Sequence, residues 1–319
     1  MPMDDLHVLP KFRDALSFLY LEHGRIDRHE NSIAFYDQEG MTPVPASSLA
    51  VLMLGPGTRV THQAVAVLAE NNCLVIWCGE ENVRFYACGM GGTRSASPLL
   101  RQARLASNEI TRLEVVTRMY RMRFMEEVDP SLTIEQLRGK EGIRVRETYA
   151  RVSRETGVPW TGRSYDRLYW RSADPVNRAL SAANSCLYGL CHAAILSAGY
   201  SPAIGFIHTG KQLSFVYDIA DLYKTELTIP LAFKTAADSP PNLERQVRLS
   251  LRDIFRETKL VQRVIPDIRL ALGETGVEVD SELDEDPALP TDLWTPESQK
   301  VDLSSLPGDD PFAEEGGSH

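Results

Sequence analysis

The stretch GFIHTGKQLSFVYDIADLYK, residues 205–224, decides between two kinds of fold for this 319-residue chain. Its first half is one residue away from a phosphate-binding P-loop, which requires Gly, any four residues, and then Gly-Lys-Ser or Gly-Lys-Thr. Gly205, Gly210 and Lys211 fit this pattern, but Gln212 stands where the magnesium-holding hydroxyl belongs. A P-loop also follows a strand, whereas the segment before this stretch reads as a helix closed by a Ser-Pro turn. The pattern therefore argues against a nucleotide-binding loop.

The second half of the stretch favours metal binding instead. His208 lies in a turn flanked by glycines, and the helix predicted from Ser214 onward places Asp218 and Asp221 on one side. One imidazole with clustered carboxylates suits a hard cation such as Mg²⁺ or Mn²⁺. Two alternatives remain open from the spacing alone, because aspartate pairs on helices are usually solvated and a single histidine is usually a hydrogen-bonded turn residue.

Around this stretch the chain changes from a strand pattern to a helical one. Short apolar runs bounded by turn residues predict strands between residues 24 and 90, interrupted by one helix near 62–72. Ser97 and Pro98 are good start signals for a helix. Apolar spacing then predicts helices over 98–127, 132–156, 175–198, 214–225 and 242–272. The predicted fold class is therefore α+β.

The predicted organisation has three parts and one linker. The boundaries are 1–90 for a small β-rich N-terminal domain, 91–97 for a linker, 98–272 for a larger all-helical domain and 273–319 for an acidic tail. The tail is rich in acidic residues and proline and has no apolar period, so we expect it to be disordered.

The charge of the chain is distributed unevenly. The net charge is −10, but residues 273–319 hold 14 acidic residues and one basic residue, Lys300. The rest of the chain carries 33 basic and 30 acidic residues. A mildly basic body with an acidic tail is compatible with a polyanionic partner.

Two features lead us to expect a cytoplasmic protein without a membrane partner. The first residues lack the basic and apolar regions of a secretory signal, and no run of 18 or more apolar residues occurs. The five cysteines form no C-x-x-C pair and no zinc spacing, which is typical of unpaired thiols in a reducing compartment.

Two basic segments are candidates for nucleic-acid binding. In residues 244–264, helical spacing places one stripe of basic side chains on a single face: Arg245, Arg248, Arg252, Arg256, Lys259 and Arg263. Like charges on one helix face repel each other unless an anion lies along them, although three acidic residues in the same segment could relieve part of this. In residues 140–171, arginines alternate with aromatic residues, as in grooves that follow phosphates and stack bases. Solvated faces and a packed aromatic loop are the alternatives.

The segment AGYSPAIGFIHTGKQLSFVYDIADLYK, residues 198–224, resembles the signature of the CRISPR-associated spacer integrases, the Cas-one family, in its subtype I-E branch. EQLRGKEGIRVRETYA, residues 135–150, resembles the family's other active-site segment, and the resemblance extends from about Leu9 to Ile268. It implies an N-terminal β-sandwich followed by a helical catalytic domain. It also implies a metal-dependent DNA integrase and endonuclease that inserts captured fragments as new spacers into a CRISPR array by 3′-hydroxyl transesterification.

The resemblance assigns roles to particular residues. Glu141, His208 and Asp221 match the catalytic metal ligands for Mg²⁺ or Mn²⁺, with Asp218 as an auxiliary carboxylate ligand. Together with the basic segments, it gives as candidate DNA-binding residues Arg59, Arg84, Arg163, Tyr165, Trp170, Tyr188, Lys211, Gln212, Lys224, Arg245 and Arg248. One departure is His23, which stands where the I-E branch tends to have a tyrosine that stacks at the fork of the incoming duplex.

The implied partners are double-stranded DNA with single-stranded 3′ ends, CRISPR repeat DNA, a second copy of the chain, and a small Cas-two protein that bridges two such dimers. Two alternatives compete with integration: a structure-specific nuclease that never integrates, and a non-catalytic DNA-binding scaffold. A tyrosine nucleophile would be an alternative to metal chemistry, but we assign Tyr165, Tyr188 and Tyr217 to stacking or packing.

Overall fold

The computed structural model describes residues 17–80, 84–91, 96–124, 129, 131–163 and 173–274. All of these residues fall within one compact unit of the chain. The expectations for Tyr165, Trp170 and the acidic tail beyond residue 274 lie outside the described residues.

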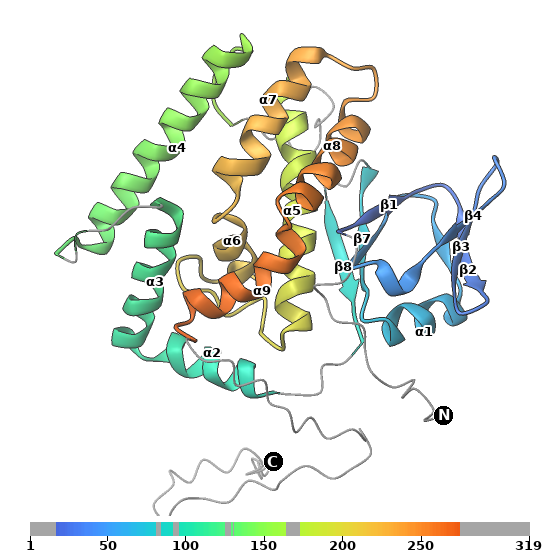
Figure 1. Cartoon of the computed structure of the whole chain (residues 1–319), viewed down its shortest axis with the longest axis horizontal. Coiled ribbons are helices and arrows are strands. Elements are labelled where there is room, and N and C mark those ends of the chain that lie inside the picture. The colour runs from blue at the N-terminus through green and yellow to red at the C-terminus, as the bar shows by residue number, and fades with distance from the viewer. Residues whose placement is uncertain are drawn as a thin grey trace, which may run out of the picture. The chain divides into compact units, whose positions relative to one another are not determined.

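The N-terminal part forms two four-stranded sheets (Figure 1). The first sheet has the order β1 (Leu19–Leu21), β5 (Val51–Leu54), β7 (Leu74–Cys78) and β8 (Phe85–Gly89). Its strands are parallel except for the antiparallel pair β7–β8. The second sheet has the order β4 (Met41–Val44), β3 (Ser32–Tyr36), β2 (Arg25–His29) and β6 (Arg59–Val60). The predicted β-rich N-terminal part is confirmed.

Strands β5 and β7 are apolar along their whole length, and apart from the exposed Trp77 their side chains are buried on both faces. Side chains on one face, such as Leu52 and Val75, pack with the second sheet and with helix α1 (His62–Glu70) in one core cluster. Alternate side chains, such as Val51 and Met53, point to the other face and belong to the core of the helical part. One face of the first sheet therefore belongs to the same core cluster as the helices.

The helical part contains these elements: α2 (Ser97–Ser107), α3 (Glu109–Phe124), α4 (Ile134–Thr156), α5 (Pro175–Ser197), α6 (Ser214–Ala220), the π-helix η5 (Lys224–Thr228), α7 (Ile229–Asp238), α8 (Leu243–Glu257) and α9 (Leu260–Ala271). Together with the mixed sheets they confirm the α+β fold class. Helix α4 begins at a capping box between Thr133 and Gln136 and ends at Gly157, which has a positive φ of 70°.

Three helix predictions were wrong in detail. The single helix expected over 98–127 is broken at Asn108, which has extended backbone and whose side chain accepts hydrogen bonds from the next helix's first turn. The single helix expected over 242–272 is broken at Lys259, which has a left-handed φ of 51°. Helix α7 was not predicted at all.

Helix α5 is the centre of the helical part, and α6, α7, α8 and α9 all pack against it. It comes close to the first sheet at Gly189, where a Cβ atom would collide with the Met53 side chain. Among the described residues α5 is the one helix long and apolar enough to cross a membrane, but 78% of the relevant window is buried inside the protein. A helix in the protein core explains both its apolar sequence and its burial. The five cysteines, all of them described, form no disulfide.

The buried His192 of α5 predicts a pH-dependent stability. Its side chain is 3% exposed, and burial lowers its pKa from 6.5 to about 4. In the unfolded chain the His192 imidazole therefore binds a proton near pH 6.5, whereas in the folded chain it binds one only near pH 4. The stability that depends on neutral His192 is fully present above pH 6.5. As the pH falls from 6.5 to 4, the free energy of unfolding decreases by up to about 3 kcal/mol.

Urea unfolding at pH 7 and pH 4.5 checks this expectation. The variant His192→Gln should lose less stability between the two pH values than the wild-type chain does. Equal losses in both proteins would show that His192 does not titrate as its burial requires.

Candidate active site

The loop after α5 is fixed by side chains from α2 and α3. Gln102 is fully buried, and its amide nitrogen donates to the carbonyl oxygens of Ser201 and Ile204 at 3.0 and 2.8 Å. The Arg112 guanidinium donates to the Phe206 carbonyl oxygen at 2.9 Å. No strand precedes Gly205 in this described segment, and the rejection of a P-loop is confirmed.

Asp218 holds this loop from inside the protein. Its carboxylate is fully buried, and Oδ2 accepts hydrogen bonds from the backbone N–H groups of Phe206 and Ile207 at 2.6 and 3.1 Å. Oδ1 accepts from the His208 backbone N–H at 2.9 Å and lies 2.7 Å from His208 Nδ1. Because a carboxylate only accepts, Nδ1 carries the ring proton and Nε2 keeps a free lone pair. That Nε2 lies 3.9 Å from Asp221 Oδ2.

This geometry corrects the role expected for Asp218. Both of its oxygens are buried and already accept hydrogen bonds, so it does not fit an auxiliary metal ligand. A carboxylate that orients a histidine from behind is the usual partner of a metal-binding histidine. Asp218 is therefore a positioning residue for His208.

Asp221 caps the C-terminus of α6 and lies between two cations. Lys224 Nζ is 2.6 Å from its Oδ1, and Arg123 Nη2 is 3.4 Å from its Oδ2. Burial alone would raise the pKa of the Asp221 carboxyl, but the charges of Lys224 and Arg123 outweigh burial and lower it below its ordinary value. The carboxylate is therefore ionised at neutral pH. The π-helix η5, which begins at Lys224, is a rare backbone form that is frequent at functional sites.

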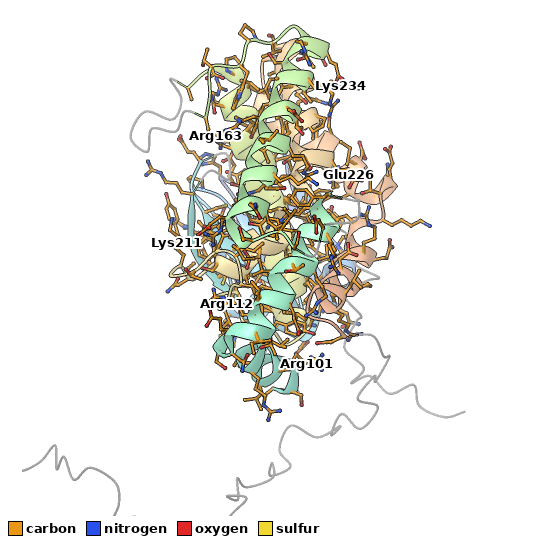
Figure 2. The ribbon with its side chains drawn as sticks, turned by 90° about the vertical axis from the view of Figure 1, so that its left-hand side faces the viewer. Arg101, Arg112, Arg163, Lys211, Glu226 and Lys234 are labelled. Atoms are coloured by element: carbon orange, nitrogen blue, oxygen red, sulfur yellow. The ribbon has the colours of Figure 1, made fainter. Side chains whose placement is uncertain are left out.

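Glu141 reaches the same place from helix α4. Its carboxylate is 15% exposed and lies 3.8 Å from Arg123 Nη1 and 3.3 Å from Arg144 Nε. Arg123 is thus shared by the two carboxylates of Glu141 and Asp221, although its own side chain is only 3% exposed. With α4 in front, Figure 2 shows Arg163 and Lys211 on one side of that helix.

A cavity of about 440 Å³ lies at this centre. Its lining includes Glu141, Asp221, Lys224, Arg163 and Tyr188. The structure therefore brings together five of the residues singled out in the sequence, while His208 approaches Asp221 from outside the lining.

Two of the cavity's cations are held in place by neighbouring groups. The Arg163 guanidinium donates to the backbone oxygen of Asn177 at 2.9 Å and to Ser181 Oγ at 3.0 Å, which ties it to α5. Lys224 Nζ lies 4.7 Å from the centre of the Tyr188 ring.

Tyr217, one of the tyrosines considered as a nucleophile, is packed against a neighbouring ring. Tyr217 packs edge-on against Tyr188 with ring centres 5.2 Å apart. Burial, followed by the neighbouring Tyr188, raises the pKa of Tyr217, which disfavours the phenolate that a nucleophile would need.

The donor types at this centre fit a divalent ion. Glu141 and Asp221 offer carboxylate oxygens, and His208 offers a lone pair on Nε2, a set that suits Mg²⁺ or Mn²⁺. In the part of the chain that the structure describes, no three His, Cys, Asp or Glu side chains are close enough to hold a metal ion as they stand. Arg123, Arg144 and Lys224 hold the two carboxylates in this structure. To bind an ion, the carboxylates must exchange some of these contacts.

The remaining candidate DNA-binding residues lie away from the cavity lining. Lys211 and Gln212 are exposed on the loop beside His208. Arg59 is exposed on β6, and Arg84 is half-buried just before β8. These four residues stay predictions.

The basic stripe expected over 244–264 differs from expectation in two ways: α8 ends at Glu257, so Lys259 and Arg263 lie beyond it, and Arg248 is covered. Arg245, Arg252 and Arg256 are exposed, as predicted. Arg248 is only 9% exposed, and its guanidinium lies 4.4 Å from the centre of the Tyr20 ring. An arginine that stacks in this way joins α8 to β1, so it does not belong to an exposed phosphate-binding stripe.

Arg123, Gln102 and Arg112 are the site residues that sequence reasoning missed. Arg123 did leave a signal, because it falls on the buried stripe of α3 with Val116 and Tyr120. A charged residue on an apolar stripe must be paired inside the protein. Gln102 left no comparable signal.

Fold and site together define a β-sheet and helix protein with a carboxylate–histidine centre surrounded by cations. A family model described as "CRISPR associated protein Cas1" matches residues 118–239. The chain is 56% identical over 308 residues to "CRISPR-associated endonuclease Cas1 2" of Thermus thermophilus, with 96% of this chain and 95% of that protein covered. It is 48% identical over 265 residues to "CRISPR-associated endonuclease Cas1" of Escherichia coli, covering 82% and 87%. The chain belongs to the Cas1 family.

Solved structures agree with this assignment. The crystal structure of a TtCas1–DNA complex matches with a TM-score of 0.77 and 54% identity, over 88% of this chain and 98% of that one. A casposase bound to an integration product matches with a TM-score of 0.61 over 84% and 95%, but at 12% identity it shows a shared fold alone.

The buried Asp218 carboxylate generates a prediction. In Asp218→Asn one acceptor oxygen becomes a donor, so His208 loses its fixed tautomer while the size of the side chain is kept. We expect DNA strand cleavage or transfer to fall by roughly 10- to 100-fold, as is usual when the outer partner of a metal-binding histidine is removed. The affinity for DNA should stay within about twofold.

Asp267→Asn is the matched control, because Asp267 also accepts a side-chain hydrogen bond, from Tyr223 at 2.7 Å, but does not line the cavity. Equal rates for Asp218→Asn and Asp267→Asn would show that Asp218 has no special role.

Proposed function

We propose that this chain is a metal-dependent DNA integrase and endonuclease that inserts captured DNA fragments as new spacers into a CRISPR array. The observation that carries the proposal is His208 Nε2, which faces Asp221 while the buried Asp218 holds Nδ1. Glu141 lies across the same cavity. Membership of the Cas1 family, and the likeness to a Cas1 solved with DNA, support the choice of substrate.

The proposed reaction is a transesterification. The 3′-hydroxyl oxygen of the captured fragment forms a bond to a phosphorus atom of the repeat DNA, and the bond from that phosphorus to its former 3′ oxygen breaks. The attacking hydroxyl loses a proton and the leaving oxygen gains one. One phosphodiester bond replaces another, so the reaction needs no nucleotide as an energy source, in agreement with the absence of a P-loop at residues 205–212.

Glu141, His208 and Asp221 would hold Mg²⁺ or Mn²⁺. When bound, such an ion polarises the scissile phosphate and stabilises charge on the attacking and leaving oxygens. His208 can serve as a ligand only while its imidazole is neutral, and Asp218 keeps Nε2 directed at the centre. Arg163 and Lys224 on the cavity wall would neutralise the negative charge of the incoming phosphate backbone.

The further parts of the proposal follow the family resemblance. The DNA would be a duplex with single-stranded 3′ ends, and the target would be CRISPR repeat DNA. The working form would be a homodimer in the cytoplasm, joined to a Cas2 partner, and the chain would belong to the I-E branch.

A nuclease that does not integrate is the second candidate, and the names of the curated relatives, which are endonucleases, favour it. Supercoiled plasmid with a CRISPR repeat, mixed with a labelled duplex, separates the two. Integration requires a 3′-hydroxyl and joins the label to the plasmid, whereas a nuclease relaxes the plasmid equally with a 3′-dideoxy duplex. Relaxation that is indifferent to the 3′ end would overturn integration.

The three proposed ligands give the next prediction. Glu141→Gln, His208→Asn and Asp221→Asn should each lower strand transfer and cleavage by more than about 100-fold, above the usual cost of losing an outer partner. DNA binding should change by less than about threefold, because the exposed arginines of α8 lie elsewhere. A chelator should stop the reaction without lowering the melting temperature.

Glu226→Gln is the control, since Glu226 lies in η5, is 46% exposed and is absent from the cavity lining. Integration at normal rates by a His208→Asn, Asp221→Asn double variant would refute the metal centre.

The exposed stripe of α8 gives a prediction about salt. If Arg245 and Arg252 neutralise phosphates, replacing both with Gln should weaken binding to every DNA sequence. The slope of log affinity against log salt should become shallower by about 2, because each phosphate contact contributes roughly 0.9.

The double variant Arg101→Gln, Arg104→Gln on α2 is the control, because both residues are exposed on a different helix. If this control shifts the slope as much as the α8 variant does, the α8 stripe is not the DNA-binding face.

A further inference from the structure

The two proposed ligand carboxylates are more than neutralised by the protein itself. Glu141 and Asp221 carry two negative charges, and three side-chain cations contact them: Arg123, Arg144 and Lys224. The carboxylate of Asp218 is held separately by three backbone N–H groups and by His208. A divalent ion that entered this centre alone would therefore add positive charge to a place that already has an excess of it.

The cations differ in how easily they can leave. Arg123 is 3% exposed, donates to the backbone oxygen of Asp218 at 3.1 Å and lies 5.5 Å from the Tyr120 ring centre. A buried guanidinium in such a setting is fixed, and arginine does not lose its proton. Lys224 is 23% exposed, lines the cavity and carries its charge on a flexible stem. Lys224 and Arg144, at 23% and 27% exposed, are both more open than Arg123, and of these two it is Lys224 that contacts Asp221.

Lys224 also makes the shortest of the contacts to the two carboxylates. Its Nζ lies 2.6 Å from Asp221 Oδ1, which is a shorter distance than any that Arg123 or Arg144 makes to the two carboxylates. An ammonium at that distance occupies Oδ1 of Asp221, whereas His208 Nε2 faces Oδ2, so Lys224 blocks one of the two oxygens that Asp221 could offer an ion.

We propose that the Lys224 ammonium occupies Asp221 in place of the divalent ion until DNA binds, so that the ion and the DNA phosphate bind cooperatively. A phosphate in the cavity gives Lys224 a new anionic partner and removes the excess of positive charge. Asp221 is then released to the ion. This inference rests on the proposed metal-dependent function. It adds that the centre binds the divalent ion only weakly while no DNA is bound.

Linkage makes the proposal quantitative. If DNA raises the affinity for the ion by some factor, the ion raises the affinity for DNA by the same factor. Coupling of this kind usually lies between about 5- and 150-fold, and we expect about tenfold or more here.

The test measures Mn²⁺ binding to the full chain by the electron paramagnetic resonance signal of the free ion. Titrations are run without DNA and with a saturating 3′-dideoxy duplex, which binds without being joined. The same duplex with the variant Glu141→Gln, Asp221→Asn gives the background of Mn²⁺ held by DNA itself. The proposal expects Mn²⁺ to bind at least about tenfold more tightly with DNA, and DNA to bind more tightly with Mn²⁺ by the same factor.

Variants of Lys224 identify the residue responsible. Lys224→Met should bind Mn²⁺ more tightly than the wild-type chain in the absence of DNA, and DNA should then add little. Lys224→Arg, which keeps the charge, should restore the coupling in part. Lys234→Met on α7 removes an exposed lysine outside the cavity lining and should behave as wild type.

The outcomes separate this inference from the proposed function. Equal Mn²⁺ affinity with and without DNA would overturn the coupling, while metal-dependent strand transfer in the same preparation would leave the proposed function standing. No Mn²⁺ binding in either titration, together with strand transfer that survives chelation, would overturn both. If Lys224→Met fails to fold, as shown by its melting curve, the wild-type titrations with and without DNA still decide the question.

Discussion

The structure of the active site depends on one buried carboxylate. Asp218 is fully buried, and its two oxygens accept from three consecutive backbone N–H groups, those of Phe206, Ile207 and His208, as well as from the His208 ring. Leaving such a charge without these donors inside a protein would be very unfavourable, so loop and helix must form together. The same contact that fixes the backbone of the loop also selects the ring tautomer of His208. The Asp218 carboxylate therefore determines both the fold of the loop and the orientation of the His208 ring.

The other ligands depend on long-range packing around α5. Asp221 follows α6, which packs on α5, whereas Glu141 comes from α4, which packs on α7 and α3. Arg123 on α3 is the group that contacts both carboxylates. Two carboxylates of separate helices repel each other, and a buried guanidinium between them offsets that repulsion during folding. The charge arrangement that lets the site assemble is thus also the arrangement that a metal ion has to disturb.

Local patterns predicted much of this structure, and they failed where distant partners decide. The strand over 74–78 and the helices over 134–156 and 175–197 follow from apolar spacing. The stretch 205–224 indicated a loop followed by a short helix, with His208, Asp218 and Asp221 close together, and the structure has that arrangement. Spacing could not show that the Asp218 carboxylate is buried and accepts hydrogen bonds from backbone N–H groups. It also could not show that Arg248 packs against Tyr20, because burial is set by segments far away in the chain.

The three proposed ligands do not by themselves determine which reaction is carried out. A carboxylate–histidine centre that activates phosphate transfer serves a water molecule and a 3′-hydroxyl equally well, because the charge that develops on the phosphate is the same in both reactions. What separates a nuclease from an integrase is which oxygen reaches the phosphorus first. Groups that hold the end of a strand and exclude water would make that choice, and in this chain the cavity wall carries Arg163, which is fixed to α5, and Tyr188 beside Lys224. Because the three proposed ligands would serve both reactions, a difference between the two activities would have to come from the groups around them.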